Sequence, residues 1–252
     1  MRRSPFGLIL LLFAGVVLLA TAATPAAAQT HARPVTPASP TIDDGLAPVD
    51  GLSGTGLTTQ HAAASGDGVL LGGDQISDGS ILCSVGFNVV KDGQDYVLTA
   101  GHCTAGMPYW ENLGPSTQSD FPTTDYGLIR DDSYAGAGAV NLYNNTVQPI
   151  SGVGNATVGE HVCASGQATQ VTCGKVIAVN QTVDYGDGNV VHGLIETDIH
   201  TDHGDSGGPL FDGSTALGTV SGGDGQTDFF QPLAPALAAF GAQLVTAGYP
   251  AP

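Results

Sequence analysis

The stretch Gly204-Asp205-Ser206-Gly207-Gly208-Pro209-Leu210 decides how this chain folds and what chemistry it can carry. Glycine accepts backbone conformations that other residues avoid, so this segment can turn tightly and direct several N–H groups toward one point. The turn would expose the hydroxyl of Ser206, which becomes an effective nucleophile only beside a base. Glycine, serine and aspartate also cluster in ordinary turns, so the interpretation depends on whether a base stands elsewhere in the chain.

Two upstream segments supply the missing groups. Leu98-Thr99-Ala100-Gly101-His102-Cys103 carries a histidine, and Thr124-Asp125-Tyr126-Gly127-Leu128 carries an aspartate. A histidine can take the proton of a serine hydroxyl, and an aspartate can hold the imidazole in the required tautomer. The order His, Asp, Ser along the chain is that of chymotrypsin and differs from the orders in subtilisin and the α/β-hydrolases. The sequence therefore predicts a catalytic triad of His102, Asp125 and Ser206.

Several further segments match in the same order. The chain resembles the bacterial streptogrisin and alpha-lytic protease branch of the chymotrypsin-like serine proteases, over roughly residues 70–245. This resemblance implies a secreted serine endopeptidase built from two packed antiparallel β-barrels. Besides the triad segments, it rests on Cys83-Ser84-Val85-Gly86-Phe87-Asn88-Val89, Phe121-Pro122, Asn155-Ala156-Thr157-Val158-Gly159, Ser221-Gly222-Gly223 and Phe229-Phe230-Gln231-Pro232.

The N-terminal segment predicts export. Arg2-Arg3, an apolar run over residues 8–20 and Ala26-Ala27-Ala28 are typical of a signal peptide, which we assign to residues 1–28. Residues 29–69, rich in Pro, Ala, Thr, Gly and Ser, predict a flexible leader or propeptide. Residues 70–252 form the predicted protease domain, with an N-terminal barrel at about 70–145 and a C-terminal barrel and helix at about 146–252.

The local patterns favour an all-β domain with a C-terminal helix. A helix is predicted over residues 232–245, where Leu233, Leu237, Phe240 and Leu244 recur at helical spacing. Short segments rich in Val, Ile, Leu and Thr, separated by turn residues, predict strands. These segments cover residues 84–90, 96–100, 126–129, 174–179, 190–197 and 216–221.

The chain has four cysteines, and in an exported protein these predict disulfides. Four cysteines allow three pairings. The resemblance implies Cys83–Cys103 and Cys163–Cys173. A zinc site is the alternative, but the paired Cys-x-x-Cys spacing typical of such sites does not occur in this sequence.

Acidic residues dominate the charge balance, with 23 Asp and Glu against 6 Lys and Arg and a formal net charge of −17. Such a surface repels nucleic acids and anionic membranes, so we expect neither as a partner after the signal peptide is cleaved. Few ion pairs can form, which predicts tolerance of mild acid because less pairing is lost on protonation. Adaptation to high salt would explain the same composition. We expect a secreted monomer acting on protein or peptide substrates.

The resemblance also implies roles for backbone groups. The N–H groups of Gly204 and Ser206 would form an oxyanion hole, the set of donors that stabilises a developing negative charge. Ser221 would support Asp125, and the backbone of Gly222 and Gly223 would pair with the substrate like an added strand. No cofactor or metal is implied.

Asp205 departs from the pattern of the branch. In relatives its carboxylate is balanced by an arginine soon after the first cysteine of a second-barrel hairpin, and here Cys163 is followed by Ala-Ser-Gly. A buried, unpaired carboxylate is costly. Cleavage after Val69 would free the amine of Leu70 to pair with it. The alternatives are His161 as partner, or a protonated Asp205.

A disulfide of the relatives is missing near the predicted specificity pocket, where this chain reads Asp198-Ile199-His200-Thr201-Asp202-His203. His200 and His203 with Asp198 and Asp202 offer a possible divalent-metal site. We favour the alternative, a polar loop at the pocket rim, and expect no loss of stability with a chelator.

The preferred residue at P1, the substrate position on the acyl side of the scissile bond, is the hardest feature to predict. Counting back from the replaced cysteine places Asp198 where trypsin-like enzymes hold a basic P1 side chain. Val220 is apolar where glutamate-specific members tend to have histidine, which argues against an acidic P1. The sequence favours an apolar or aromatic P1, with a basic P1 as the alternative. A catalytically inactive homologue that only binds a partner is the competing function.

Overall fold

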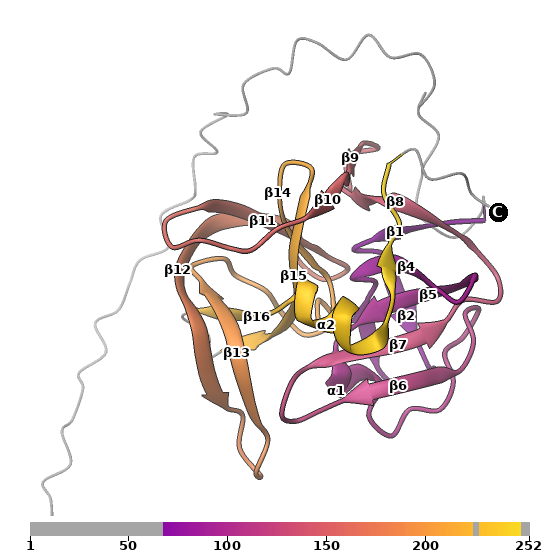
Figure 1. Cartoon of the computed structure of the whole chain (residues 1–252), viewed down its shortest axis with the longest axis horizontal. Coiled ribbons are helices and arrows are strands. Elements are labelled where there is room, and N and C mark those ends of the chain that lie inside the picture. The colour runs from indigo at the N-terminus through magenta and orange to yellow at the C-terminus, as the bar shows by residue number, and fades with distance from the viewer. Residues whose placement is uncertain (1–67, 224–226, 248–252) are drawn as a thin grey trace, which may run out of the picture. The chain divides into compact units, whose positions relative to one another are not determined.

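A computed structural model describes residues 68–223 and 227–247 of the chain (Figure 1). The predicted signal peptide and nearly all of the predicted leader lie outside the described residues. The described chain is rich in strands, and none of its helices is long and apolar enough to cross a membrane. Its elements are β1 Val69–Gly72, β2 Gln75–Ser77, β3 Leu82–Ser84, β4 Phe87–Lys91, β5 Gln94–Thr99, α1 Gly101–Thr104, β6 Ser116–Asp120, β7 Tyr126–Arg130, β8 Ala135–Asn141, β9 Val147–Pro149, β10 Gly152–Val153, β11 His161–Gly166, β12 Gln170–Asp184, β13 Val190–Thr197, β14 Pro209–Asp212, β15 Thr215–Gly223, β16 Asp228–Pro232, α2 Leu233–Phe240 and β17 Gln243–Leu244.

The first half of the domain is built mainly from short antiparallel hairpins, and β1 pairs in parallel with β8. Its strands form a five-stranded sheet in the order β17-β4-β5-β7-β6, a three-stranded sheet β1-β8-β9 and the pair β2-β3. Asp92 and Gly93 join β4 to β5, and their φ values of 53° and 77° are those of a two-residue turn that suits the twist of a hairpin. This turn sets the register of β5, whose far end leads directly into α1.

The second half closes on itself. Its strands run in the order β15-β14-β11-β12-β13-β16, and β16 pairs back with β15. Each neighbouring pair in this ring is antiparallel, while β10 adds to β15 in parallel. Closure leaves no exposed edge in the ring. The predicted all-β fold of two antiparallel barrels with a short C-terminal helix is confirmed.

The C-terminal segment differs from its prediction. The predicted helix over residues 232–245 ends at Phe240, because Gly241 takes a left-handed conformation, with φ 63°, and its N–H caps the helix. Residues 243–244 then form β17, which pairs with β4 of the first half.

The strand β9, residues 147–149, pairs with β8 of the first half, although it lies beyond the predicted boundary between the halves at about residue 145.

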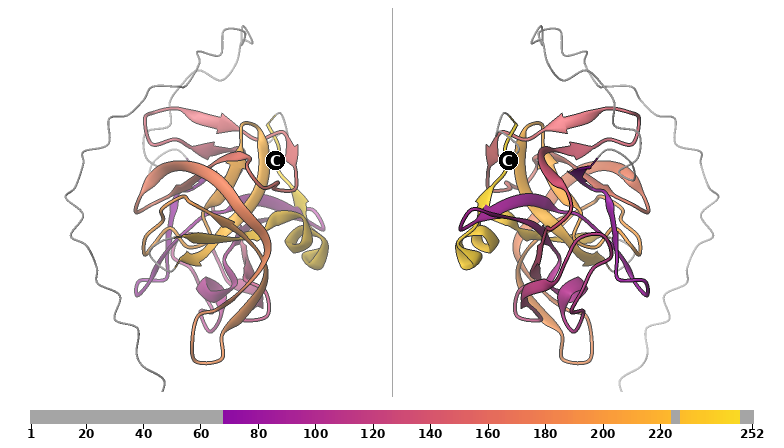
Figure 2. Two further views of the ribbon diagram at one scale, coloured as in Figure 1. Left: turned by 90° about the vertical axis from the view of Figure 1, so that its left-hand side faces the viewer. Right: turned by 90° about the vertical axis from the view of Figure 1, so that its right-hand side faces the viewer.

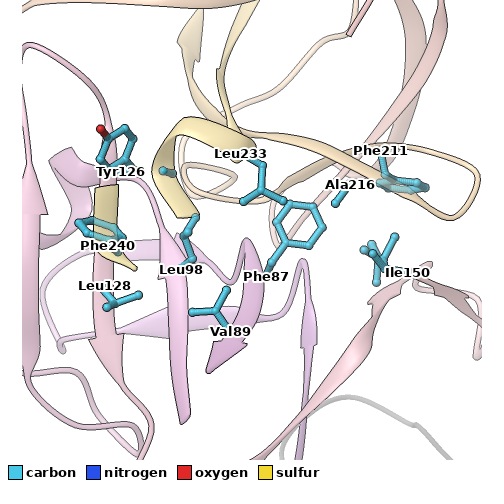
Figure 3. Close-up of a cluster of buried hydrophobic side chains, with 12 residues drawn as sticks. Phe87, Val89, Leu98, Tyr126, Leu128, Ile150, Phe211, Ala216, Leu233 and Phe240 are labelled. Atoms are coloured by element: carbon cyan, nitrogen blue, oxygen red, sulfur yellow. The ribbon is translucent and has the colours of Figure 1, made fainter. Parts of the chain in front are cut away.

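A shared hydrophobic core joins the two halves at α2 (Figure 3). Leu233 and Phe240 of this helix lie beside Phe87 and Leu98 of the first half, and the same cluster includes Phe211 of β14. All of these side chains are at most 5% exposed. Figure 2 shows the strands of the two halves from opposite sides, with α2 and β17 against the first half. The segments that carry Asp125 and Ser206 lie where the two halves meet, because Asp125 binds Gln231 and Ser84 binds Gly204 across the boundary.

Ion pairs are few in the described part of the chain, as the composition predicts: His102 lies beside Asp125, and Arg130 beside Asp132. The guanidinium of Arg130 lowers the pKa of Asp132, and backbone N–H groups lower that of Asp78. Burial raises the pKa of Asp131, whose Oδ2 atom finds no hydrogen-bond partner within residues 68–223 and 227–247. Acid tolerance itself stays a prediction.

Asp131→Asn is expected to stabilise the protein at neutral pH. The amide keeps an oxygen for the N–H groups of Ser133 and Tyr134, 3.0 and 2.9 Å from Oδ1, and removes a buried charge. A raised folded pKa means that ionisation of Asp131 opposes folding, and this penalty grows as the pH rises from the ordinary pKa to the raised one and is constant above it. The gain in Tm, on the order of 3 °C at pH 7, should vanish below the ordinary pKa of 3.8. Thermal unfolding across pH, with the exposed Asp212→Asn as control, checks this; a gain that persists in acid contradicts it.

Candidate active site

Three segments bring the predicted triad to one pocket. His102 lies in α1 immediately after β5, Asp125 immediately before β7, and Ser206 in the loop that precedes β14. Ser84 of β3 binds this loop across the two halves, donating its N–H to the carbonyl of Ser206 and its hydroxyl to that of Gly204, each at 2.8 Å. The pocket has a volume of about 560 Å³ and is lined by, among others, His102, Phe121, Asp125, Tyr185, Ser206, Val220 and Asp228.

His102 and Asp125 form a close pair. Nδ1 of His102 lies 2.9 Å from Oδ2 of Asp125, and the backbone N–H of His102 donates to Oδ1 at 2.8 Å. Asp125 is fully buried, and its ionised carboxylate can only accept hydrogen bonds. Nδ1 must therefore carry a proton, which leaves the lone pair of Nε2 free to accept one. Phe121 packs edge-on against the imidazole, with ring centroids 5.9 Å apart.

Asp125 is held by two residues besides the histidine. Ser221 donates its hydroxyl to Oδ2 at 2.6 Å, and the side-chain oxygen of Gln231 accepts the N–H of Asp125 at 2.9 Å. Tyr185 in turn donates to Ser221 at 3.1 Å, and burial raises the pKa of Tyr185 to about 12. The predicted support by Ser221 agrees with this contact. Tyr185 was not predicted, because it stands in a turn-rich segment between two strands and no motif marks it.

Most backbone N–H groups in the loop before β14 donate hydrogen bonds within the described part of the chain, and two do not. Within residues 201–208, each N–H donates to an acceptor in the described part of the chain, except those of Gly204 and Ser206. The carbonyl of Asp205 accepts the N–H of Gly208 at 2.8 Å, and this fixes the opposite direction of the Ser206 N–H, since both belong to one planar peptide. Two directed, unused donors beside a serine can stabilise an oxyanion.

Sequence comparison places this arrangement in a known family. A model of the family described as Trypsin matches residues 70–237. The chain belongs to the trypsin family. Over 208 residues it is 45% identical to streptogrisin-D of Streptomyces griseus, covering 78% of this chain. It spans only 53% of the length of that relative.

Solved structures agree with the streptogrisin and alpha-lytic protease resemblance of this trypsin-family chain. Thermobifida fusca protease A superposes with a TM-score of 0.68 at 38% identity, covering 71% of this chain and 100% of that one. A glutamic acid-specific serine protease, described as using a histidine triad in substrate binding, superposes at 0.66 with 42% identity, covering 69% and 100%.

Both disulfides implied by the resemblance are present. Cys83–Cys103 ties β3 to α1, beside His102, and Cys163–Cys173 joins β11 to β12. Within residues 68–223 and 227–247, no three His, Cys, Asp or Glu side chains are grouped closely enough to hold a metal. The loop with His200 and His203 lies instead at the pocket wall.

Asp205 is balanced by a turn rather than by a cation. Its carboxylate, 1% exposed, accepts the N–H groups of Ala168 at 2.7 Å, Thr169 at 3.1 Å and Asp202 at 2.9 Å, and the hydroxyl of Thr169 at 2.7 Å. Such donors stabilise an ionised carboxylate directly. His161 takes no part in these contacts. In this uncut chain the nitrogen of Leu70 belongs to a peptide bond within β1, so pairing of Asp205 with the Leu70 amine of a cleaved chain stays a prediction. The sequence could not indicate this set of donors, because backbone donors carry no residue signature.

Thr169→Val is expected to weaken this support. The change keeps the shape of the side chain and removes one hydroxyl donor from a buried carboxylate, a loss worth about 1.5–3 kcal/mol of unfolding free energy. Because Asp205 directly precedes Ser206, we expect a lower kcat as well. Denaturant unfolding and peptide hydrolysis check both effects, and Thr169→Ser, which retains the hydroxyl, should resemble the parent. A valine variant as stable and active as the serine variant would contradict this role.

The predicted substrate-binding residues fall into two groups. Val220, Ser221, Gly222 and Gly223 all line the pocket. Asp198 does not: it is exposed, and its carboxylate accepts the N–H of Lys175 at 2.5 Å on the neighbouring strand. The count from the missing cysteine misled because Asp198 follows β13 directly and its carboxylate binds Lys175 of β12. An unpredicted acid, Asp228 of β16, lines the pocket instead.

Proposed function

We propose that this protein is a secreted serine endopeptidase that hydrolyses peptide bonds through a covalent acyl-enzyme. The observation that carries the proposal is the buried Asp125 carboxylate 2.9 Å from Nδ1 of His102, in one pocket with Ser206. This pairing leaves Nε2 of His102 unprotonated, as a base that removes a serine proton must be.

The chemistry follows from these groups. Ser206 Oγ attacks the scissile carbonyl as His102 removes its proton, and the oxyanion lies against the N–H groups of Gly204 and Ser206. His102 then protonates the leaving amine, and the C–N bond breaks to leave an ester on Ser206. Water, deprotonated by His102, hydrolyses this ester and regenerates the serine hydroxyl. Asp125 keeps the tautomer and stabilises the imidazolium without taking the proton.

Substrate backbone and side chain have separate sites in this proposal. Gly222 and Gly223 lie at the end of β15, beyond its pairing with β14, and the peptide backbone would add there as a further strand. Val220 and Tyr185 provide apolar walls for a long P1 side chain. Export, a monomeric state and the absence of nucleic-acid or membrane partners stay predictions from the sequence, supported by the signal-like N-terminus and the net charge of −17.

The test is the intact mass of the secreted protein before and after treatment with a fluorophosphonate, which phosphonylates only an activated serine. We expect one adduct on the parent and none on Ser206→Ala. The same spectrum reports whether the mature chain begins at Leu70. A folded, processed parent without an adduct would contradict the proposal and favour the inactive homologue that binds a partner.

A further inference from the structure

Asp228 is a buried acid with an accessible pocket in front of it. It begins β16, is 4% exposed, and lines the same pocket as His102 and Ser206. Its register partners are Gly223 of β15 and Thr197 of β13. No motif in the sequence marked it, and the mechanism above does not use it.

In the part of the chain that the structure describes, the donors found for the carboxylate of Asp228 belong to Thr201. Thr201 donates its hydroxyl to Oδ1 at 2.5 Å and its N–H to Oδ2 at 3.2 Å. A carboxylate offers about four acceptor positions. No Lys, Arg or His of residues 68–223 and 227–247 lies within 4.0 Å as an ion-pair partner of Asp228. Asp205, which faces no substrate, shows the contrast, since it receives N–H and O–H donors from three residues.

Two glycines border Asp228 in the pocket wall. A Cβ atom on Gly223 would lie 2.3 Å from Oδ1 of Asp228, and one on Gly222 would lie 3.1 Å from the ring of Tyr185. A side chain at either position would therefore crowd the carboxylate or the ring. The apolar surfaces of Val220 and Tyr185 suit an aliphatic stem, and a charged end group beyond that stem would reach the acid.

The charge of Asp228 separates the three classes of P1 side chain. An apolar group would remove water from the carboxylate without pairing it, which is costly. An acidic group would place two carboxylates in one pocket, where like charges oppose each other. A cation would fill the open acceptor positions, and the net charge of −17 attracts cationic substrates at long range.

We infer that Asp228 is the specificity-determining acid of the pocket and that the protein cleaves after lysine or arginine. The inference rests on the proposed endopeptidase function. It replaces the apolar or aromatic P1 that the sequence favoured, and it assigns the acid of the alternative to Asp228 on β16 instead of Asp198, just after β13.

Matched peptide substrates test the inference on the mature protein. They differ only at P1, which is Arg, citrulline, Lys, Phe, Leu or Glu; citrulline has nearly the shape of arginine without its charge. We expect kcat/KM for Arg to exceed that for citrulline by about a hundredfold, the size of effect produced by an unpaired buried charge. Asp228→Asn should remove most of that ratio and change kcat/KM for the Phe and Leu substrates by only a few-fold. Asp198→Asn, the same change at the other acid, should preserve the ratio.

A binding measurement separates this inference from the catalytic proposal. Benzamidine, a planar cation, and benzamide, its neutral counterpart, are titrated calorimetrically into Ser206→Ala, which needs no turnover. We expect benzamidine to bind at least tenfold more tightly than benzamide, and Asp228→Asn in the same background to abolish that difference. Equal binding of the two probes, or equal cleavage after Arg and citrulline, overturns the inference even if the fluorophosphonate labels Ser206. A preference for Phe, Leu or Glu that survives Asp228→Asn overturns it as well. If benzamidine binds more tightly than benzamide but the fluorophosphonate does not label Ser206, the role of Asp228 is supported and the proposed endopeptidase activity is contradicted.

Discussion

Asp125→Asn is expected to lower kcat by about 10⁴-fold while leaving the fold intact. The backbone N–H of His102 donates to Oδ1 at 2.8 Å, so the amide oxygen must occupy that position. The amide NH₂ then takes the place of Oδ2 and faces both Nδ1 of His102 and the hydroxyl of Ser221. Since the amide now donates, Nδ1 becomes the acceptor and the proton moves to Nε2. An Nε2 that already carries a proton cannot take one from Ser206.

The measurement is kcat on a peptide substrate together with the rate of fluorophosphonate labelling. Both should fall, because both need an activated serine, whereas Tm should change little. Asp120→Asn, an exposed carboxylate at the end of β6, is the matched control and should retain turnover. If Asp125→Asn stays within tenfold of the parent, Asp125 does not set the tautomer of His102, and the triad fails as an account of this site.

Removing Cys83–Cys103 is expected to reduce both stability and turnover. The two cysteines are separated by 20 residues, and closing a loop of this length restricts the unfolded chain by about 3 kcal/mol. Cys103 also follows His102 directly in α1, so the cross-link ties the histidine segment to β3. Changing both residues to alanine should therefore make the position of His102 less fixed and lower the unfolding free energy.

The second disulfide provides the control. Cys163–Cys173 spans 10 residues, and its removal should cost a similar unfolding free energy, on the order of 3 kcal/mol. It joins β11 to β12 and touches none of the triad segments, so turnover of the surviving folded fraction should persist. Urea unfolding with oxidised and double-alanine proteins gives the stabilities, and active-site titration gives turnover per folded molecule. Equal losses of turnover in the two variants would show that the first disulfide has no special bearing on His102.

The residues of the predicted triad stand inside local motifs that a single chain displays: Ser206 stands in a glycine-rich turn, and His102 precedes a cysteine. Ser221 was likewise marked by the two glycines after it. The pairing of the four cysteines came from the family resemblance, and it is confirmed. The strands were predicted from short segments rich in Val, Ile, Leu and Thr, although β12 extends over residues 170–184 where only 174–179 were predicted.

The remaining features depend on residues that meet only after folding. Thr169 lies 36 residues from the Asp205 that it binds, and Asp228 lies 27 residues from Thr201. The course of the chain decides which acid lines the pocket: Asp228 lies in β16 and lines it, whereas Asp198, just after the neighbouring β13, binds the N–H of Lys175 instead. The helix was overestimated because an apolar spacing continues through Gly241 into β17, where the same residues serve a strand.

The return of the chain from the second barrel to the first has a consequence for the order of synthesis. Residues 233–244 cap the core shared by both halves and add β17 to β4, which formed from residues made some 150 positions earlier. During translation, the core shared by the two halves can therefore be completed only after residues 233–244 have left the ribosome.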